Sequence, residues 1–195
     1  MTRGRPLAFS PDQAVMAAMQ VFWARGYDAA STRDLLAAMQ ISRSSLYQAF
    51  GNKEQLFLEA LGRYRTGLVE RLQRRLDEAP TALAFFEALY RDTAREAESE
   101  RAALGCLIFN SATELGQRGD RPAREASLSV EVITGLFHQA VERGQAEGDI
   151  AAHRDARALA LYLTLGMAGL RAMLKAGTAA TEAEQAAELV LATLR

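Results

Sequence analysis

The chain has 195 residues, of which 49% are hydrophobic and 24% charged, and its formal net charge is −1. This composition is typical of a soluble globular protein with one domain or two small ones, and it excludes a protein that coats nucleic acid with its whole surface. The single cysteine excludes an intrachain disulfide framework. Together with the lack of a signal-peptide pattern, it favours a cytoplasmic location. The longest apolar stretch, residues 159–165, is too short to span a bilayer, so no membrane partner is expected.

Charge is distributed unevenly along the chain. Residues 1–53 carry six Lys or Arg and three Asp, a net charge of +3, whereas the remainder has a net charge of −4. A basic segment joined to an acidic one indicates that only the N-terminal end meets a polyanion such as DNA.

Apolar residues recur with a helical period throughout, which predicts an all-α fold. A first helix is expected from Pro11, after the N-cap Ser10, to near Gly26, and short helices are expected after Ser31 and Ser42. A long helix over 53–78 follows, and further helices are predicted over 80–98, 105–116, 122–147, 154–176 and 181–194. The expected domains are residues 1–52, which bind DNA, and residues 53–195, which sense a ligand and dimerise.

Residues 31–50 have the layout of a helix-turn-helix, in which two short helices, each with a capping serine, are separated by a turn. Apolar side chains are spaced to form a small core with the first helix: Val15, Met19, Phe22, Leu35, Leu36, Met39, Ile41, Leu46 and Phe50. The intervening side chains are cations, hydroxyls, an amide and a phenol, and residues 42–53 contain no acid. Such a face suits phosphates and base edges.

The stretch from Gly26 to Glu54 resembles the N-terminal domain of the TetR family of transcriptional regulators. The resemblance is carried by Gly26-Tyr27, Ser31/Thr32 to Leu36, Ile41-Ser42, Leu46-Tyr47, Phe50, Lys53-Glu54 and Leu56. Two positions depart from the family pattern. Gln40 occupies the turn where Gly is usual, and Gln reaches positive φ at a greater cost. Ser44 occupies a recognition-helix position that is often Gly, which bears on base preference.

The resemblance implies that residues 42–48 form a recognition helix in the major groove of double-stranded DNA. The candidate contacts to bases and phosphates are Thr32, Arg33, Ser42, Arg43, Ser44, Ser45, Tyr47, Gln48 and Lys53. The alternative is that these side chains form an ordinary solvated face.

The segment Arg3-Gly4-Arg5-Pro6 resembles the core of an AT-hook. It is narrow enough to lie in an A·T minor groove with both guanidinium groups, of Arg3 and Arg5, pointing inward. The alternative is a solvated tail.

The segment from Gly105 to Leu115 resembles one that, in a branch of the family, opens a helix beside the ligand cavity. The candidate effector contacts are aromatic side chains with three polar anchors. The aromatic residues are Tyr64, Phe85, Phe86, Tyr90, Phe109 and Phe137, and the anchors are Asn110, Thr113 and His138. The alternative, which helical spacing favours for each single aromatic residue, is a plain core.

Cys106 is a candidate thiol sensor, because it is expected in the first turn of a helix, where the helix dipole favours a thiolate. Reaction with an electrophile or an oxidant would then shift the DNA-binding domain. The alternative is an inert buried cysteine.

The last two predicted helices are too apolar to face solvent, and the family uses them as a four-helix dimer interface. We therefore expect a homodimeric repressor, bound to a palindromic operator and released by a small apolar or electrophilic effector or by modification of Cys106. No cofactor or metal is expected. The alternatives are an architectural DNA-binding protein that ignores ligands, an activator, and an all-helical enzyme, although only His138 and His153 are available as bases at neutral pH and no catalytic motif is present.

Overall fold

The computed structural model describes residues 9–195, so the predicted minor-groove contacts of Arg3 and Arg5 lie outside the described residues. The described chain is helical and contains no strand. Its helices are α1 (Pro11–Arg25), α2 (Thr32–Met39), α3 (Arg43–Phe50), α4 (Lys53–Glu78), α5 (Ala82–Arg95), α6 (Glu100–Leu104), α7 (Leu107–Leu115), α8 (Arg121–Glu147), α9 (Ala156–Lys175) and α10 (Ala180–Leu191). Single 3-10 turns cover Glu96–Glu98 and Ala192–Leu194.

Local sequence signals set the N-terminal boundaries. The Ser10, Ser31 and Ser42 side chains each accept a hydrogen bond from a backbone N–H in the first turn of α1, α2 and α3. In α2 the cap is reciprocal, because the Asp34 carboxylate also accepts from the Ser31 backbone. These caps fix where the two short helices begin, and so which side chains each of them presents to solvent.

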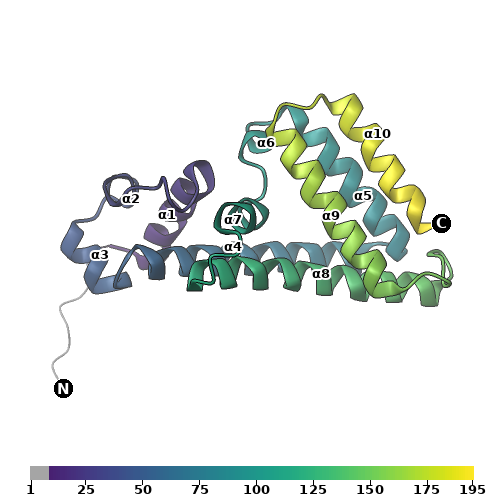
Figure 1. Cartoon of the computed structure of the whole chain (residues 1–195), viewed down its shortest axis with the longest axis horizontal. Coiled ribbons are helices and arrows are strands. Elements are labelled where there is room, and N and C mark those ends of the chain that lie inside the picture. Colours follow the sequence, from purple (N-terminus) through teal and green to yellow (C-terminus); the bar gives the residue numbers. More distant parts are fainter. Residues whose placement is uncertain (1–8) are drawn as a thin grey trace, which may run out of the picture.

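Helices α1–α3, hereafter the head, gather around the N-terminal end of α4, and α4–α10 form the body (Figure 1). Within the body, α4 and α8 run side by side, and α5, α9 and α10 pack together at the end far from the head (Figure 1). Helix α7 contacts α1, α4 and α8, so it lies where head and body meet. A single buried apolar cluster extends from Val15 in the head to Leu194 at the far end.

The predicted helix over 80–98 was wrong in its extent, and one helix was missed. α5 ends at Arg95, and after a 3-10 turn the chain restarts as the short α6, which Ser99 caps by accepting from the Ala102 N–H. The cause is Ser99, whose extended backbone (φ −87°, ψ 151°) breaks the helical run and begins a new one. Gly105 at φ 67° then ends α6, so that Cys106 is the N-cap of α7 instead of a first-turn residue.

Helix α9 is longer than the apolar stretch expected from the sequence. By length and composition alone its 20 residues could cross a membrane, with a mean hydropathy of 1.3, and 39% of that window is buried. A core helix of a soluble protein has the same properties, and α9 packs against α5, α8 and α10.

Candidate DNA-binding site and effector-sensing residues

Helix α3 presents a polar face to solvent. Leu46 and Phe50 are buried and fix α3 to the core of the head. The opposite side exposes Arg43, Ser44, Tyr47 and Gln48, together with the capping Ser42, while Ser45 is half-buried. Tyr47 is 52% exposed, so its phenol is open to solvent in spite of its apolar ring. A short helix with apolar anchors behind and hydroxyl, amide and guanidinium groups in front has the composition that major-groove readout requires.

The serines at the start of α3 form a small hydrogen-bonded cluster. The Ser42 hydroxyl accepts from the Ser45 N–H at 3.1 Å and lies 2.8 Å from the Ser44 Oγ and 2.9 Å from the Ser45 Oγ. The cluster orders the N-terminal end of α3, where unpaired backbone N–H groups favour a phosphate.

Two head arginines, Arg33 and Arg43, form no ion pair within the part of the chain that the structure describes, whereas Arg25 is paired with Asp34 at 2.8 Å. Thr32 is the half-buried first residue of α2. Arg33 and Arg43 are therefore available to phosphates without first breaking an internal contact.

Lys53, another predicted phosphate contact, is engaged within the protein. Its ammonium group donates to the backbone oxygen of Asp28 at 3.2 Å and lies 4.8 Å from the centroid of the Tyr27 ring. Lys53 thus ties the loop between α1 and α2 to the start of α4, a role that the sequence pattern did not reveal.

The Glu114 carboxylate, at the C-terminal end of α7, binds the loop between α1 and α2 from the body side. Glu114 accepts hydrogen bonds from the N–H groups of Tyr27 at 2.9 Å and Asp28 at 2.8 Å. Gly26 is required there, because its φ is 83° and an added Cβ would lie 2.6 Å from a Glu114 carboxylate oxygen. The sequence did not identify Glu114 as a contact of the head. Gly26 was the one feature of the sequence that indicated a close approach at this loop.

An ion pair strengthens this contact between the C-terminal end of α7 and the α1–α2 loop. Arg118 donates to both carboxylate oxygens of Asp28, at 3.0 and 2.5 Å. That hydrogen bonding holds the pKa of Asp28 below its usual range, so the ion pair persists to a lower pH than an ordinary aspartate would allow. We call Glu114 and Arg118, with Tyr27 and Asp28 as their partners, the α7 latch.

Most of the predicted effector residues lie within the packed core. Phe86 and Phe137 are buried and meet edge to face, 5.4 Å between ring centroids. Tyr90 is fully buried, its hydroxyl donates to the backbone oxygen of Leu163, and burial raises its pKa. Phe109 is half-buried against the core.

The predicted polar anchors do not gather with these aromatic rings. Asn110 donates to the Leu104 backbone oxygen at 2.8 Å, and the exposed Thr113 donates to the Phe109 oxygen within its own helix. His138 lines a surface depression between α8 and α9. The structure therefore does not bring the predicted set together in one cavity.

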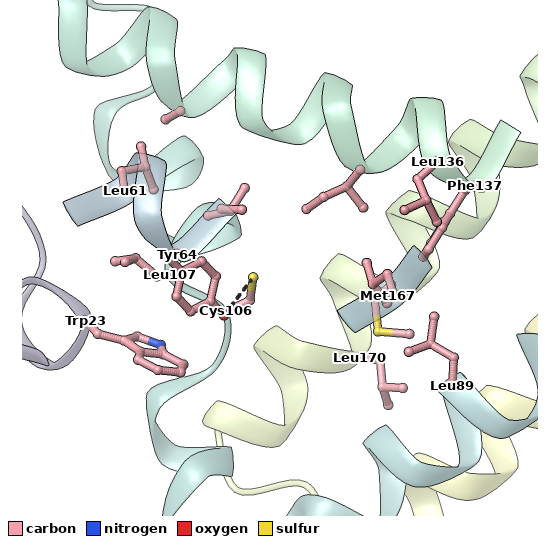
Figure 2. Packing of buried hydrophobic residues seen from close by; sticks show 14 of the residues in the cluster. Trp23, Leu61, Tyr64, Leu89, Cys106, Leu107, Leu136, Phe137, Met167 and Leu170 are labelled. Carbon is pink, nitrogen blue, oxygen red and sulfur yellow. Dashed lines mark hydrogen bonds between the residues drawn. The ribbon is translucent and has the colours of Figure 1, made fainter. Parts of the chain in front are cut away.

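Cys106 and Tyr64 do meet (Figure 2). Cys106 is 5% exposed, and its sulfur accepts a hydrogen bond from the Tyr64 hydroxyl at 3.7 Å. Burial and the nearby cysteine raise the pKa of Tyr64. The Tyr64 ring packs edge to face on Trp23 of α1, with 5.0 Å between the ring centroids. The Tyr64 side chain therefore connects the Cys106 thiol to the head.

Comparison with known proteins gives the same picture. Residues 15–60 match the family model of bacterial regulatory proteins of the tetR family, and residues 82–190 match that of the tetracyclin repressor-like C-terminal domain. The chain is 30% identical to the HTH-type transcriptional repressor ComR of Escherichia coli (strain K12), over 97% of this chain and 91% of ComR.

Solved structures agree with these matches. A cysteine mutant of the TetR family regulator CifR, in complex with 26-bp double-strand operator DNA, has a TM-score of 0.88 at 34% identity, covering 98% of this chain and all of that one. The reduced form of Escherichia coli NemR shares the fold, with a TM-score of 0.82 at 19% identity over 92% and 93% of the two chains.

The fold and the exposed face of α3 define a helix-turn-helix protein that binds DNA. The chain belongs to the TetR family, and it is a transcriptional repressor of that family and not an enzyme.

Proposed function

We propose that the protein binds a palindromic operator as a homodimer and is released by a small apolar or electrophilic effector or by modification of Cys106. The observation that carries the operator-binding step is the polar face of α3, with Arg43 and Gln48 exposed above buried apolar anchors. Residues 1–52 supply the DNA-binding domain, including the arm with Arg3 and Arg5, and residues 53–195 the sensing and dimerisation domain. Thr32, Arg33, Ser42 to Ser45, Tyr47 and Lys53 complete the proposed contacts, and the protein acts in the cytoplasm, where its DNA lies.

Exposed apolar side chains support the homodimer. α9 exposes Leu161, Tyr162, Leu165 and Met173, and α10 exposes Leu189, with exposed fractions of 44–74%. Residues spaced in this way lie on one side of a helix, and a contiguous apolar stripe on a soluble protein marks an interface. A two-fold dimer presents two heads to two half-sites, as a palindrome requires.

The α7 latch and the Cys106 contact support a release step. α7 holds the α1–α2 loop at its C-terminal end through Glu114, and its N-cap Cys106 meets Tyr64, which packs on Trp23. The Cys106 sulfur is buried in contact with Tyr64, so we expect a group added to it to displace the Tyr64 ring and, with it, the contact to Trp23 and the position of α7. An effector that binds in the body and moves α7 would act on the head through the same contacts. The two heads of the dimer would then lie at a different spacing, which lowers the affinity for the operator.

Selection from random duplexes tests operator binding and finds the bound sequence in the same experiment. The selected duplex is then titrated with protein by fluorescence anisotropy at several salt concentrations. Gln48→Ala removes a proposed base contact and should weaken specific binding by about tenfold, because a good base contact discriminates by about 1–3 kcal/mol. Gln20→Ala, an exposed glutamine of α1 outside the α3 face, should bind as the wild type does. If the selection enriches no sequence, operator binding is wrong.

The Cys106 branch has its own test. A mild thiol-reactive electrophile is added to the protein–operator complex, and wild type is compared with Cys106→Ser. Release of wild type only supports the thiol sensor. Equal release of both assigns the response to another site. Release of neither contradicts the thiol sensor and leaves a non-covalent effector as the releasing signal.

A further inference from the structure

A groove of about 480 Å³ lies where α1 of the head faces α4 and α6 of the body. Small-molecule sites typically have volumes of roughly 300–1,000 Å³. The apolar part of the groove is formed by Met16, Met19, Trp23, Tyr64 and Leu104. Apart from Tyr64, none of these was a predicted effector contact, so the groove is distinct from the proposed body site.

The charged lining of the groove has one sign. Arg63, Arg71 and Arg101 line it, and no acid does. Arg63 is held by Asp12 at 2.5 Å and by Glu59 at 3.2 Å. Within residues 9–195, the side chains of Arg71 and Arg101 form neither an ion pair nor a hydrogen bond. Two uncompensated guanidinium groups beside an apolar floor match a ligand with one anionic end, because guanidinium groups bind carboxylates through charge-assisted hydrogen bonds.

A glycine opens the groove at the cost of helix stability. Gly67 lies in the middle of α4, where glycine costs about 1 kcal/mol relative to alanine. A Cβ at this position would lie 3.4 Å from an Arg71 guanidinium nitrogen. A larger side chain at residue 67 would therefore compete with an occupant for the space in front of Arg71.

Trp23 contributes its indole ring to the wall of the groove. Arg101 lies 5.9 Å from the centroid of this ring, so the cation and the aromatic ring line the groove together. An aromatic face beside a cation offers one occupant both an apolar contact and a charge partner.

We propose that this groove binds an apolar monocarboxylate. The carboxylate pairs with Arg71 and Arg101, and the apolar chain lies against Met16, Met19 and the Trp23 ring. Such a ligand touches the head and the body at once, which makes the groove a regulatory site separate from Cys106. The inference does not depend on operator binding, since its test uses the free protein.

Decanoate is a suitable probe, and Trp23, the only tryptophan in the chain, reports on it directly. Decanoate should change the Trp23 emission saturably, and calorimetry should give the same Kd. The double variant Arg71→Gln/Arg101→Gln should bind about tenfold or more weakly, because it loses the charge-assisted contacts. Arg74→Gln removes the same charge from α4 outside the groove and should bind as the wild type does.

A second pair of variants tests the space instead of the charge. Gly67→Leu should block decanoate, whereas Gly62→Leu, on the same helix with no atom within 4 Å of its added Cβ, should not. The proposal is overturned if decanoate does not bind saturably. It is also overturned if decanol or decyltrimethylammonium binds as tightly as decanoate, or if both arginine substitutions leave the Kd unchanged.

Discussion

Gln40 ends α2 in the left-handed conformation, with φ 55° and ψ 39°, and it is the one non-glycine residue of the described chain with positive φ. A side chain with a Cβ is strained there, so Gln40→Gly should raise the free energy of unfolding by about 1 kcal/mol. Ala38→Gly, two residues earlier inside α2, should lower it by about the same amount. Urea denaturation measures both, and equal destabilisation by the two glycines would contradict the backbone argument.

Arg43 makes a separate prediction at the scale of one side chain. It is exposed at the start of α3 and has no acidic partner within residues 9–195. If it pairs with a phosphate, Arg43→Ala should weaken binding to all duplexes and reduce the slope of log K against log salt by about 1. Arg74→Ala, on the body, should leave the slope unchanged. A loss of affinity confined to the selected sequence would instead assign Arg43 to a base.

At the scale of elements, the features that could be predicted from the sequence are those that depend on residues close together in the chain. The caps Ser10, Ser31 and Ser42 predicted the starts of α1 to α3, because capping depends on neighbours within one turn. Glu114 could not be predicted, because its partner Asp28 is 86 residues away and the contact exists only after α7 reaches the head. The polar face of α3 was visible in the sequence for the same local reason, whereas the groove beside Trp23 depends on how three helices meet.

Helix α7 contacts both the head and the body, and Glu114 is its hydrogen-bonding contact with the α1–α2 loop. Glu114→Ala removes the acceptor of two backbone N–H groups. Amide hydrogen exchange at Tyr27 and Asp28 should therefore quicken by about tenfold, since a hydrogen bond to a charged group contributes about 1.5–3 kcal/mol and water replaces part of it.

Thr113→Ala is the matched control for this change, because Thr113 is exposed and bonds only to the Phe109 oxygen of its own helix. Exchange at Tyr27 and Asp28 should be unchanged in this variant. Unaltered exchange in Glu114→Ala as well would mean that the latch does not hold the α1–α2 loop in solution, and that another contact couples α7 to the head.

At the scale of the whole molecule, the proposed dimer would bring two heads to the operator through the apolar stripe of α9 and α10. Leu165 is 62% exposed at the centre of the α9 part of that stripe, so burying a carboxylate there against a second copy is costly. Leu165→Glu should sediment as a monomer at micromolar concentration and lose operator affinity by about 100-fold or more, because each head then binds its half-site alone.

The head itself should remain intact in this variant, since Leu165 lies in α9, remote from α1–α3 (Figure 1), and circular dichroism should show the wild-type helical content. Thr66→Glu places the same charge on the exposed side of α4 and should remain dimeric. A Leu165→Glu protein that stays dimeric would move the interface to another face. A monomer that still binds the full operator tightly would show that one head is sufficient. That result would contradict binding to two half-sites, but it would leave DNA recognition by α3 unaffected.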